Sequence, residues 1–188
     1  EITERDWSSD VCSSDLDGLA SFEPAFVDEL STILSWGFDY IQRDGAGVGP
    51  SDWARDREGG SVYLRLSTRT IEQPRRTIDA GLAADIVDGC YWMRRPGPNA
   101  QVVVAYTGAL APEAIEAVGR MAEDRRDVGL LAVTSADRLH AGWSAAQRAR
   151  ERGDHDATSH IERLLADMPP QCALVTALDG HPATLAWL

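Results

Sequence analysis

The chain has 188 residues, of which 44% are hydrophobic and 26% are charged, the balance of an ordinary globular domain. Its formal net charge of −12 argues against binding to nucleic acid or to an anionic membrane surface, because both would repel it. All 18 Lys and Arg positions are arginine. Without a lysine amine, this segment cannot carry out pyridoxal, Schiff-base aldolase or P-loop chemistry.

The three cysteines lack the CxxC spacing of a metal or redox site. Two of them, Cys90 and Cys172, lie in apolar stretches typical of buried thiols, which favours a reduced, cytoplasmic setting. No apolar run approaches the roughly 20 residues needed to span a bilayer, and the N-terminus lacks a basic segment followed by an apolar one. We therefore expect a soluble, non-exported protein.

The first 16 residues, EITERDWSSDVCSSDL, contain a near-duplication (SSDV, then SSDL) and neither helical nor strand periodicity. They resemble translated sequencing-adapter read-through, which would carry no function. A disordered acidic leader is the alternative. We set residues 1–18 apart from the fold on either interpretation.

The first ordered pattern is a helix expected over residues 23–42, with Pro24 near its start. Its apolar positions fall on one side: Phe26, Leu30, Ile33, Leu34, Gly37 and Ile41. The glycine-rich stretch 43–60 predicts a loop, and it lacks the GxGxxG or GxxxxGK spacing of a phosphate site. The alternation in residues 61–66 predicts a strand. Residues 71–78 have no periodicity, so we expect an extended connector there and a domain boundary between residues 74 and 75.

The rest of the chain is organised around residues 101–135, which have the pattern of one strand–helix–strand unit. An apolar, β-branched run at 102–107 predicts a central strand, Pro112 suits the first turn of a helix, and residues 128–134 predict the next strand. A crossover of this length implies parallel strands with a right-handed connection, and hence an α/β fold. A short helix at 79–87 and a strand at 89–94 are expected before this unit.

Three further elements are expected after it. A helix begins near residue 136, and Ser159 with Glu162 matches the capping box of another helix. Residues 172–178 predict a final strand, followed by a turn into a helix after Pro182. The chain ends in four residues, 185–188, that are mainly apolar and carry no cap, which favours an interpretation of the chain as a truncated piece.

Candidate ligand-binding residues follow the strands, because open α/β sheets bind ligands beyond the carboxyl ends of their strands. Arg69 could hold a carboxylate or phosphate in bidentate fashion, although a solvated or ion-paired arginine is equally common. Asp137 follows the second strand of the central unit. Asp179 and His181 could form a carboxylate–histidine pair for acid–base work, but an ordinary turn and helix cap is the favoured interpretation.

No catalytic or metal-binding residue is predicted. The spacing of His140, His155 and His160 fits no HExxH or Cys₂His₂ pattern, so we expect surface or packing histidines. There is no GxSxG elbow, and neither Cys90 nor Cys172 has an adjacent base.

From about residue 19 to its end, the chain resembles the C-terminal part of the homodimeric pyruvate dehydrogenase E1 component, a member of the transketolase superfamily. The stretches that carry the resemblance are FEPAFVDELSTIL, GGSVYLRLSTRTIEQP, VVVAYTGALAPEAIEAV, LLAVTSADRLHAGW, SHIERLL and LVTALDGHPATLAWL. The resemblance implies the tail of a pyrimidine-binding α/β domain at residues 19–74. It implies a truncated transketolase C-terminal-like domain at 75–188, a three-layer sandwich with a mostly parallel sheet.

The resemblance also implies a parent enzyme that uses thiamine diphosphate and Mg²⁺ to decarboxylate pyruvate after glycolysis. The parent would be a cytoplasmic homodimer that passes the two-carbon unit to the lipoyl acetyltransferase (E2). The family's GDG motif with a later Asn is absent, and Gly153-Asp154-His155 does not match it. We therefore expect an inactive fragment that binds no cofactor alone and contributes dimer contacts and scaffold. The alternative is a free-standing, non-catalytic α/β module that binds a small anion.

Overall fold

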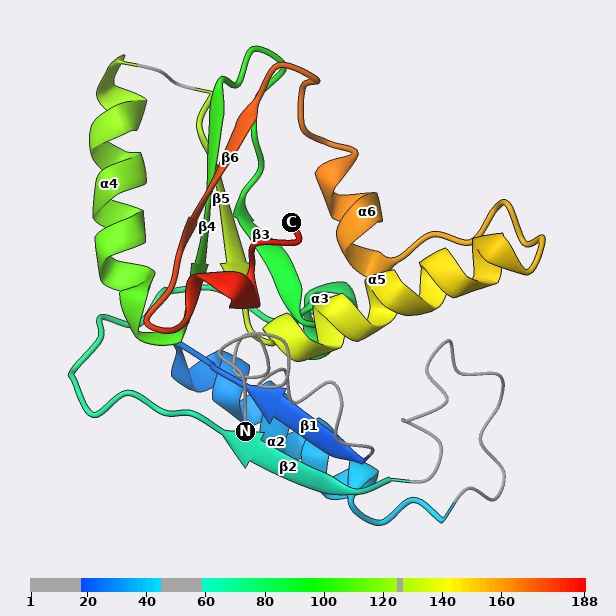
Figure 1. Cartoon of the computed structure of the whole chain (residues 1–188). Coiled ribbons are helices and arrows are strands. Elements are labelled where there is room, and N and C mark those ends of the chain that lie inside the picture. Colours follow the sequence, from blue (N-terminus) through cyan, green and yellow to red (C-terminus); the bar gives the residue numbers. More distant parts are fainter. Residues whose placement is uncertain (1–17, 45–58, 125–126) are drawn as a thin grey trace, which may run out of the picture.

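Among the residues that the structure describes, three parallel strand pairings and one antiparallel pairing define the architecture (Figure 1). The computed structural model describes residues 18–44, 59–124 and 127–188. Strands β1 (Leu19–Phe22) and β2 (Ser61–Leu64) pair in parallel as a small sheet. A second sheet has four strands in the order β3-β5-β4-β6. The expected leader and most of the expected glycine-rich loop lie outside the described residues.

Helix α2 (Val27–Tyr40) lies between the two strands of the small sheet in the chain, and it is shorter than the helix expected from the sequence. The helix starts late because Oε2 of Glu29 accepts hydrogen bonds from the backbone N–H groups of Ala25 and Phe26 and so closes its first turn. The preceding strand β1 was not predicted. Gly37 lies close to β2, where an added Cβ would be 3.3 Å from a methyl group of Val62.

Helix α3 (Ala80–Asp88) and strand β3 (Cys90–Arg94) follow the extended connector, as the sequence predicts. The side chain of Asp79 caps the helix by accepting from the N–H of Leu82. Gly89 ends it in the left-handed conformation, with φ of 111°. This reversal sends β3 antiparallel to β5, so the sheet is mixed.

The predicted strand–helix–strand unit is confirmed. It consists of β4 (Val102–Thr107), α4 (Ala111–Asp124) and β5 (Gly129–Val133), joined by a short 3₁₀ turn, η3 (Gly108–Leu110). β4 pairs in parallel with β5 on one side and with β6 (Ala173–Ala177) on the other, so it is central. The fold class is α/β with a mostly parallel sheet.

Helices cover both faces of this sheet (Figure 1). α4 lies on one face, and α5 (Ala136–Glu151) and α6 (His160–Leu165) lie toward the other. The capping box at the start of α6 is present as predicted. After β6 the expected helix is a single 3₁₀ turn, η4 (Pro182–Thr184), and Leu185 behind it is 1% exposed.

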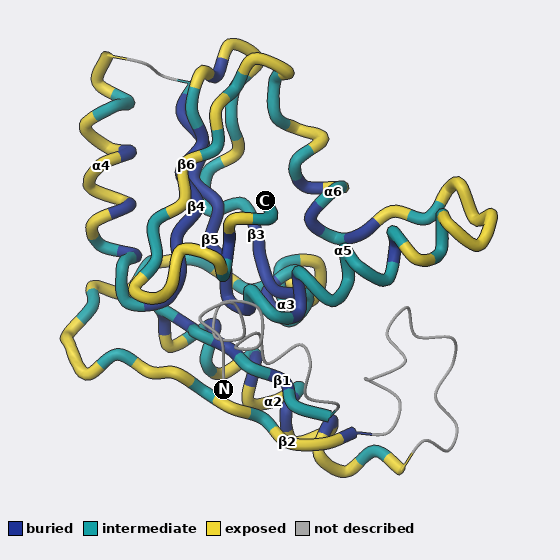
Figure 2. The backbone as a smooth tube through the Cα atoms, in the orientation of Figure 1, coloured by how far each residue is buried: buried dark blue, intermediate teal, exposed yellow. Residues whose placement is uncertain are grey.

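Alternate residues of the central strands belong to two hydrophobic clusters. Figure 2 shows that buried residues are concentrated in these central strands. Val104 and Tyr106 pack in one cluster with α4, whereas Val103 and Ala105 pack in the other with α5 and α6. The first cluster also holds Phe22, Phe26, Ile33 and Tyr40 of the small sheet and α2. The core is therefore continuous across the position of the expected domain boundary.

Candidate functional site

The carboxyl ends of the two sheets meet at one place, which we call the strand-end junction: Glu23, Arg65, Gly108, Ser135 and Asp179. Backbone contacts fix the two sheets there. The N–H of Glu23, just after β1, donates to the carbonyl of Thr134 after β5 at 2.7 Å. Ser135 Oγ donates to the carbonyl of Ser21 at 2.5 Å. Open α/β sheets bind ligands at such carboxyl ends.

Arg65 spans the junction from the end of β2. Its Nη1 donates to the carbonyl of Asp179 at 2.5 Å and approaches Oε2 of Glu23 at 3.3 Å, and its Nη2 binds Oδ2 of Asp179 at 3.1 Å. The side chain of Asp179 is 71% exposed. A single guanidinium group thus ties the small sheet to the loop that follows β6.

Glu23 is the half-buried carboxylate of the junction. Burial raises the pKa of its carboxyl group, Arg65 opposes that shift, and the charges of Asp137 and Asp179 add to it. Gly108, with φ of 44°, lets the backbone pass close by, since an added Cβ would be 3.3 Å from Cβ of Glu23. The junction is an acidic site held together by one arginine.

Two of the four predicted residues take part in the junction. Asp179 binds Arg65 directly, and Asp137 acts on Glu23 through its charge. His181 accepts a hydrogen bond at Nδ1 from the N–H of Ala183 and caps η4. Asp179 thus binds an arginine of the other sheet, and His181 caps a 3₁₀ turn.

Arg69, the fourth predicted residue, lies beyond β2 and pairs with Glu113 of α4, with Nη1 to Oε1 at 2.7 Å. This hydrogen bond lowers the pKa of the Glu113 carboxyl group. Both side chains are about half exposed. Arg69 therefore already faces a carboxylate, so an anion would have to displace Glu113.

The sequence reasoning missed Glu23 and Arg65 as site residues. Arg65 alternates with apolar residues in the predicted strand, so it was interpreted as a residue on the polar face of that strand. Glu23 was assigned to the start of a helix. The available signal was their position at strand ends, and it became usable only once β1 was known to be a strand.

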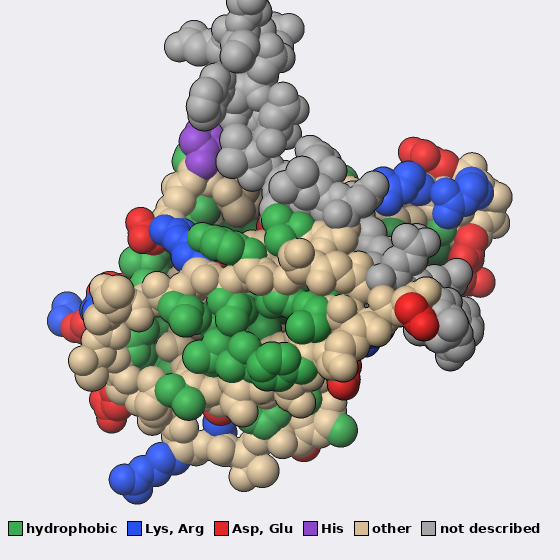
Figure 3. Space-filling view, turned by 90° about the horizontal axis from the view of Figure 1, so that it is seen from below, with side chains coloured by type: hydrophobic (Ala, Val, Ile, Leu, Met, Phe, Trp, Pro, Cys, Tyr) green, Lys and Arg blue, Asp and Glu red, His purple; other side chains and the backbone are tan. Residues whose placement is uncertain are grey.

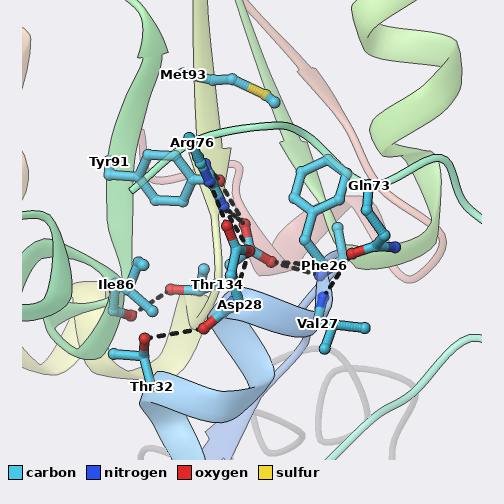
Figure 4. Close-up of polar contacts among 12 residues, drawn as sticks. Phe26, Val27, Asp28, Thr32, Gln73, Arg76, Ile86, Tyr91, Met93 and Thr134 are labelled. Carbon is cyan, nitrogen blue, oxygen red and sulfur yellow. Dashed lines mark hydrogen bonds and ion pairs between the residues drawn. The ribbon is translucent and has the colours of Figure 1, made fainter. Parts of the chain in front are cut away.

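A second polar cluster is buried where α2 meets β3, and we call it the Arg76 network (Figure 4). Arg76 from the connector binds both carboxylate oxygens of Asp28, with Nε to Oδ2 at 2.6 Å and Nη2 to Oδ1 at 2.9 Å. Its Nη1 donates to the hydroxyl of Tyr91 at 2.7 Å, and that hydroxyl donates to Oε1 of Glu29 at 2.5 Å. The guanidinium group also lies over the rings of Phe26 and Tyr91.

The charges of this network are set by burial and by the arginine. Glu29 is 1% exposed, and burial raises the pKa of its carboxyl group against the hydrogen bonds from Tyr91 and two backbone N–H groups. Burial also acts on Asp28, but the hydrogen bonds and charge of Arg76 outweigh it and lower the pKa of that carboxyl group. The members of the network bind one another and link three segments: α2, the connector that carries Arg76, and β3.

The described residues contain no group of three or more His, Cys, Asp or Glu side chains that could hold a metal ion. Nε2 of His160 lies 2.7 Å from the carbonyl oxygen of Cys90 and donates to it, and His140 packs against Trp143 and Trp187. In the described ranges, no helix is both long and apolar enough to cross a bilayer.

Solved structures share this fold. The Leishmania mexicana transketolase aligns with 93% of the chain at 14% identity and a TM-score of 0.57. A transketolase variant from Pichia stipitis aligns with 90% at 13% identity and a TM-score of 0.52, and another, in complex with fructose 6-phosphate, has a TM-score of 0.53. The chain spans only 19–20% of the length of these proteins. Neither a protein-family model nor a curated protein matches the sequence.

Proposed function

We propose that this chain is part of a thiamine-diphosphate-dependent enzyme of the transketolase superfamily, with the pyruvate dehydrogenase E1 component as its parent. The observation that carries the proposal is the likeness of the fold to about a fifth of the transketolase chain, over 93% of the present chain in the Leishmania mexicana protein. At 14% identity this likeness concerns the fold alone. The sequence stretches named above favour pyruvate dehydrogenase over other members.

In this proposal the parent decarboxylates pyruvate and transfers the two-carbon unit to the lipoyl group of the E2 acetyltransferase. Bound thiamine diphosphate would supply the carbanion chemistry, and the protein would supply binding and orientation. The parent would act in the cytoplasm as a homodimer. The described residues do not provide the metal-binding motif, so we assign them no catalytic step.

The role that we assign to this part of the parent is structural. It would hold the end of a pyrimidine-binding domain, residues 19–74, against a C-terminal domain, residues 75–188. The contacts of Arg65 at the strand-end junction and of Arg76 in the buried network support this role, because both arginines bind residues on either side of that division. The contacts of these two arginines and the continuous core would fix the relative orientation of the two domains.

Calorimetric titration of the 188-residue chain with thiamine diphosphate and Mg²⁺ tests the placement of the cofactor site. We expect no saturable heat from this chain, and cofactor binding with pyruvate decarboxylation from the product of a longer reading frame that contains it. Saturable binding by the 188-residue chain would contradict the proposal that the cofactor motifs lie elsewhere.

A further inference from the structure

The connector between β2 and α3 is fixed to the rest of the molecule by side chains. Within the described part of the chain, the backbone groups of residues 66–78 form no hydrogen bond with another backbone group. Side chains of the connector that contact other segments include Arg69, Gln73, Arg76, Ile71 and Ile78. A segment without backbone pairing can open once its side-chain contacts break, so its local stability is low.

The first turn of α2 receives a cap from this connector. Phe26, the residue before the helix, has no side-chain acceptor, so the N–H groups of the first turn need partners from elsewhere. Oε1 of Gln73 accepts a hydrogen bond from the N–H of Val27 at 2.8 Å, although the two residues are 46 positions apart (Figure 4). Gln73 therefore caps the helix from a distant part of the chain.

Further N–H groups of this turn are bound by carboxylates that Arg76 holds in place. Oε2 of Glu29 accepts from the N–H groups of residues 25 and 26, and Oδ1 of Asp28 accepts from the N–H of Glu29. Arg76 binds Asp28 directly, and its Nη2 lies 3.5 Å from Oε1 of Glu29. If Arg76 left, the buried Glu29 would lose its nearby cation, which is costly in a buried site. The turn and the connector are thus coupled.

On its other side the first turn of α2 is open to solvent. Val27 is 65% exposed. Helix α2 and strand β2 form the lower part of the molecule in Figure 1, and Figure 3, which views the molecule from below, shows many hydrophobic side chains at the surface. The first turn is therefore held mainly from the side of the connector.

We propose that residues 71–78 form a strap that closes on the first turn of α2, and that the strap and residues 25–30 open together while both sheets stay folded. Opening breaks the contacts of Gln73 and Arg76 with α2. The backbone hydrogen bond between Glu23 and Thr134 at the strand-end junction lies outside this unit and stays in place. Because the strap spans the expected boundary between residues 74 and 75, its opening releases one of the two arginine contacts across that boundary. The inference does not depend on the proposed activity.

Hydrogen exchange followed by NMR tests whether the two segments open as one unit. In Gln73→Leu, the N–H of Val27 loses its acceptor and should exchange about fivefold faster. The N–H groups of residues 25 and 26, which Gln73 does not touch, should accelerate by the same factor, and so should the Nε–H of Arg76. The amides of β4 should keep their rates. Acceleration confined to Val27, or equal acceleration in β4, would overturn the proposal.

Gln42→Leu is the matched control. Gln42 is exposed, as Gln73 is, and its Nε2 donates to the carbonyl of Phe38 near the other end of α2. We expect residues 25–27 to exchange in this variant at the rates of the parent chain. Acceleration there equal to that in Gln73→Leu would show a general weakening of α2 and would contradict the coupling to the strap.

The parent chain provides a second test, which needs no substitution and holds even if Gln73→Leu fails to fold. In urea below the unfolding transition, the N–H groups of residues 25–27 and of Leu30 should converge on one opening free energy with one urea dependence, below that of β4. Separate urea dependences would show independent openings and would overturn the proposal. Neither measurement needs cofactor or substrate, so a failure would leave the proposed activity unaffected.

Discussion

Arg76 stabilises the fold through several partners at once. Its side chain is 17% exposed, binds Asp28 through two hydrogen bonds and donates to the Tyr91 hydroxyl, which in turn binds the buried Glu29. Removing a member of a buried charged network leaves the others unpaired, and this costs more than the network contributes when intact. Arg76 is therefore the residue whose loss should weaken the chain most.

Replacing Arg76 with alanine should lower the free energy of unfolding by about 3 kcal/mol, because Asp28 and Glu29 would lose their buried cation. Arg120→Ala is the matched control. Arg120 also forms an ion pair, with Glu116, but its side chain is 77% exposed, so its loss should cost less than about 0.5 kcal/mol. Urea denaturation of both variants measures the difference. Equal losses would show that the buried network adds nothing beyond a surface pair.

Glu162 provides a pH dependence at the residue scale. The hydrogen bond from Arg150 lowers the pKa of its carboxyl group to about 2; burial opposes this shift, and hydrogen bonds from Ser159 add to it. Because the folded-state pKa lies below that of the unfolded chain, the stabilisation is present above about pH 4.5 and is lost as the pH falls toward 2.

In Glu162→Gln the stability should therefore fall less steeply than in the parent chain across this window, while the amide still serves in the capping box. Urea midpoints measured from pH 6 down to about pH 2 test this prediction. Glu116→Gln, in an exposed pair, is the control. A stability difference that does not change with pH would contradict the assignment of the shift to Glu162.

Residues whose roles depend on local spacing could be predicted from the sequence, and residues whose roles depend on tertiary contacts could not. Ser159 and Glu162 are three positions apart and form the predicted capping box. Glu29 and Tyr91 are 62 positions apart, and no local pattern indicates their contact. Arg65 and Asp179 are separated by 114 positions, although Asp179 was predicted as a strand-end candidate.

At the scale of elements, glycines have different structural roles at the end of a helix and inside one. Gly89 ends α3 with φ of 111°, and an added Cβ would lie 2.6 Å from the carbonyl oxygen of Ser135. Gly119 lies inside α4 with open space around it. The first glycine is required by the turn into β3, whereas the second only weakens a helix.

The same substitution should therefore have opposite effects at these two positions. Gly119→Ala should raise the free energy of unfolding by roughly 0.5–1 kcal/mol, since alanine is the better helix residue. Gly89→Ala should lower it by more than that, because both the backbone conformation and the close contact oppose a side chain. Thermal unfolding of the two variants would contradict this account if both shifted the midpoint in the same direction.

Element types were predictable where periodicity was long, as in β4, α4 and β5. Strand β1 was missed because four residues, LASF, carry too little alternation to identify a strand. The start of α2 was placed too early because Pro24 suggested a helix start, whereas the carboxylate of Glu29 closes the first turn at Phe26. The helix expected after Pro182 is one 3₁₀ turn, since Leu185 packs into the core.

At the scale of the whole molecule, the chain joins a two-stranded parallel sheet to a four-stranded mixed sheet through one hydrophobic cluster to which both sheets contribute. The fold class followed from the sequence pattern, because a strand–helix–strand unit of this length allows few arrangements. The exposure of several apolar residues of α2 became visible only in the structure, where Leu34 is 37% and Ile41 is 48% exposed whereas Ile33 is buried. The sequence pattern placed Leu34 and Ile41 on one apolar side of the helix together with Ile33.

Sequencing the gene outward from both ends of this reading frame tests the proposed parent enzyme most directly. Our account predicts that the frame continues upstream into a GDG motif followed by Asn, and downstream beyond Trp187. A start codon near Leu19 together with a stop codon directly after Leu188 would contradict it, and would favour a free-standing α/β module.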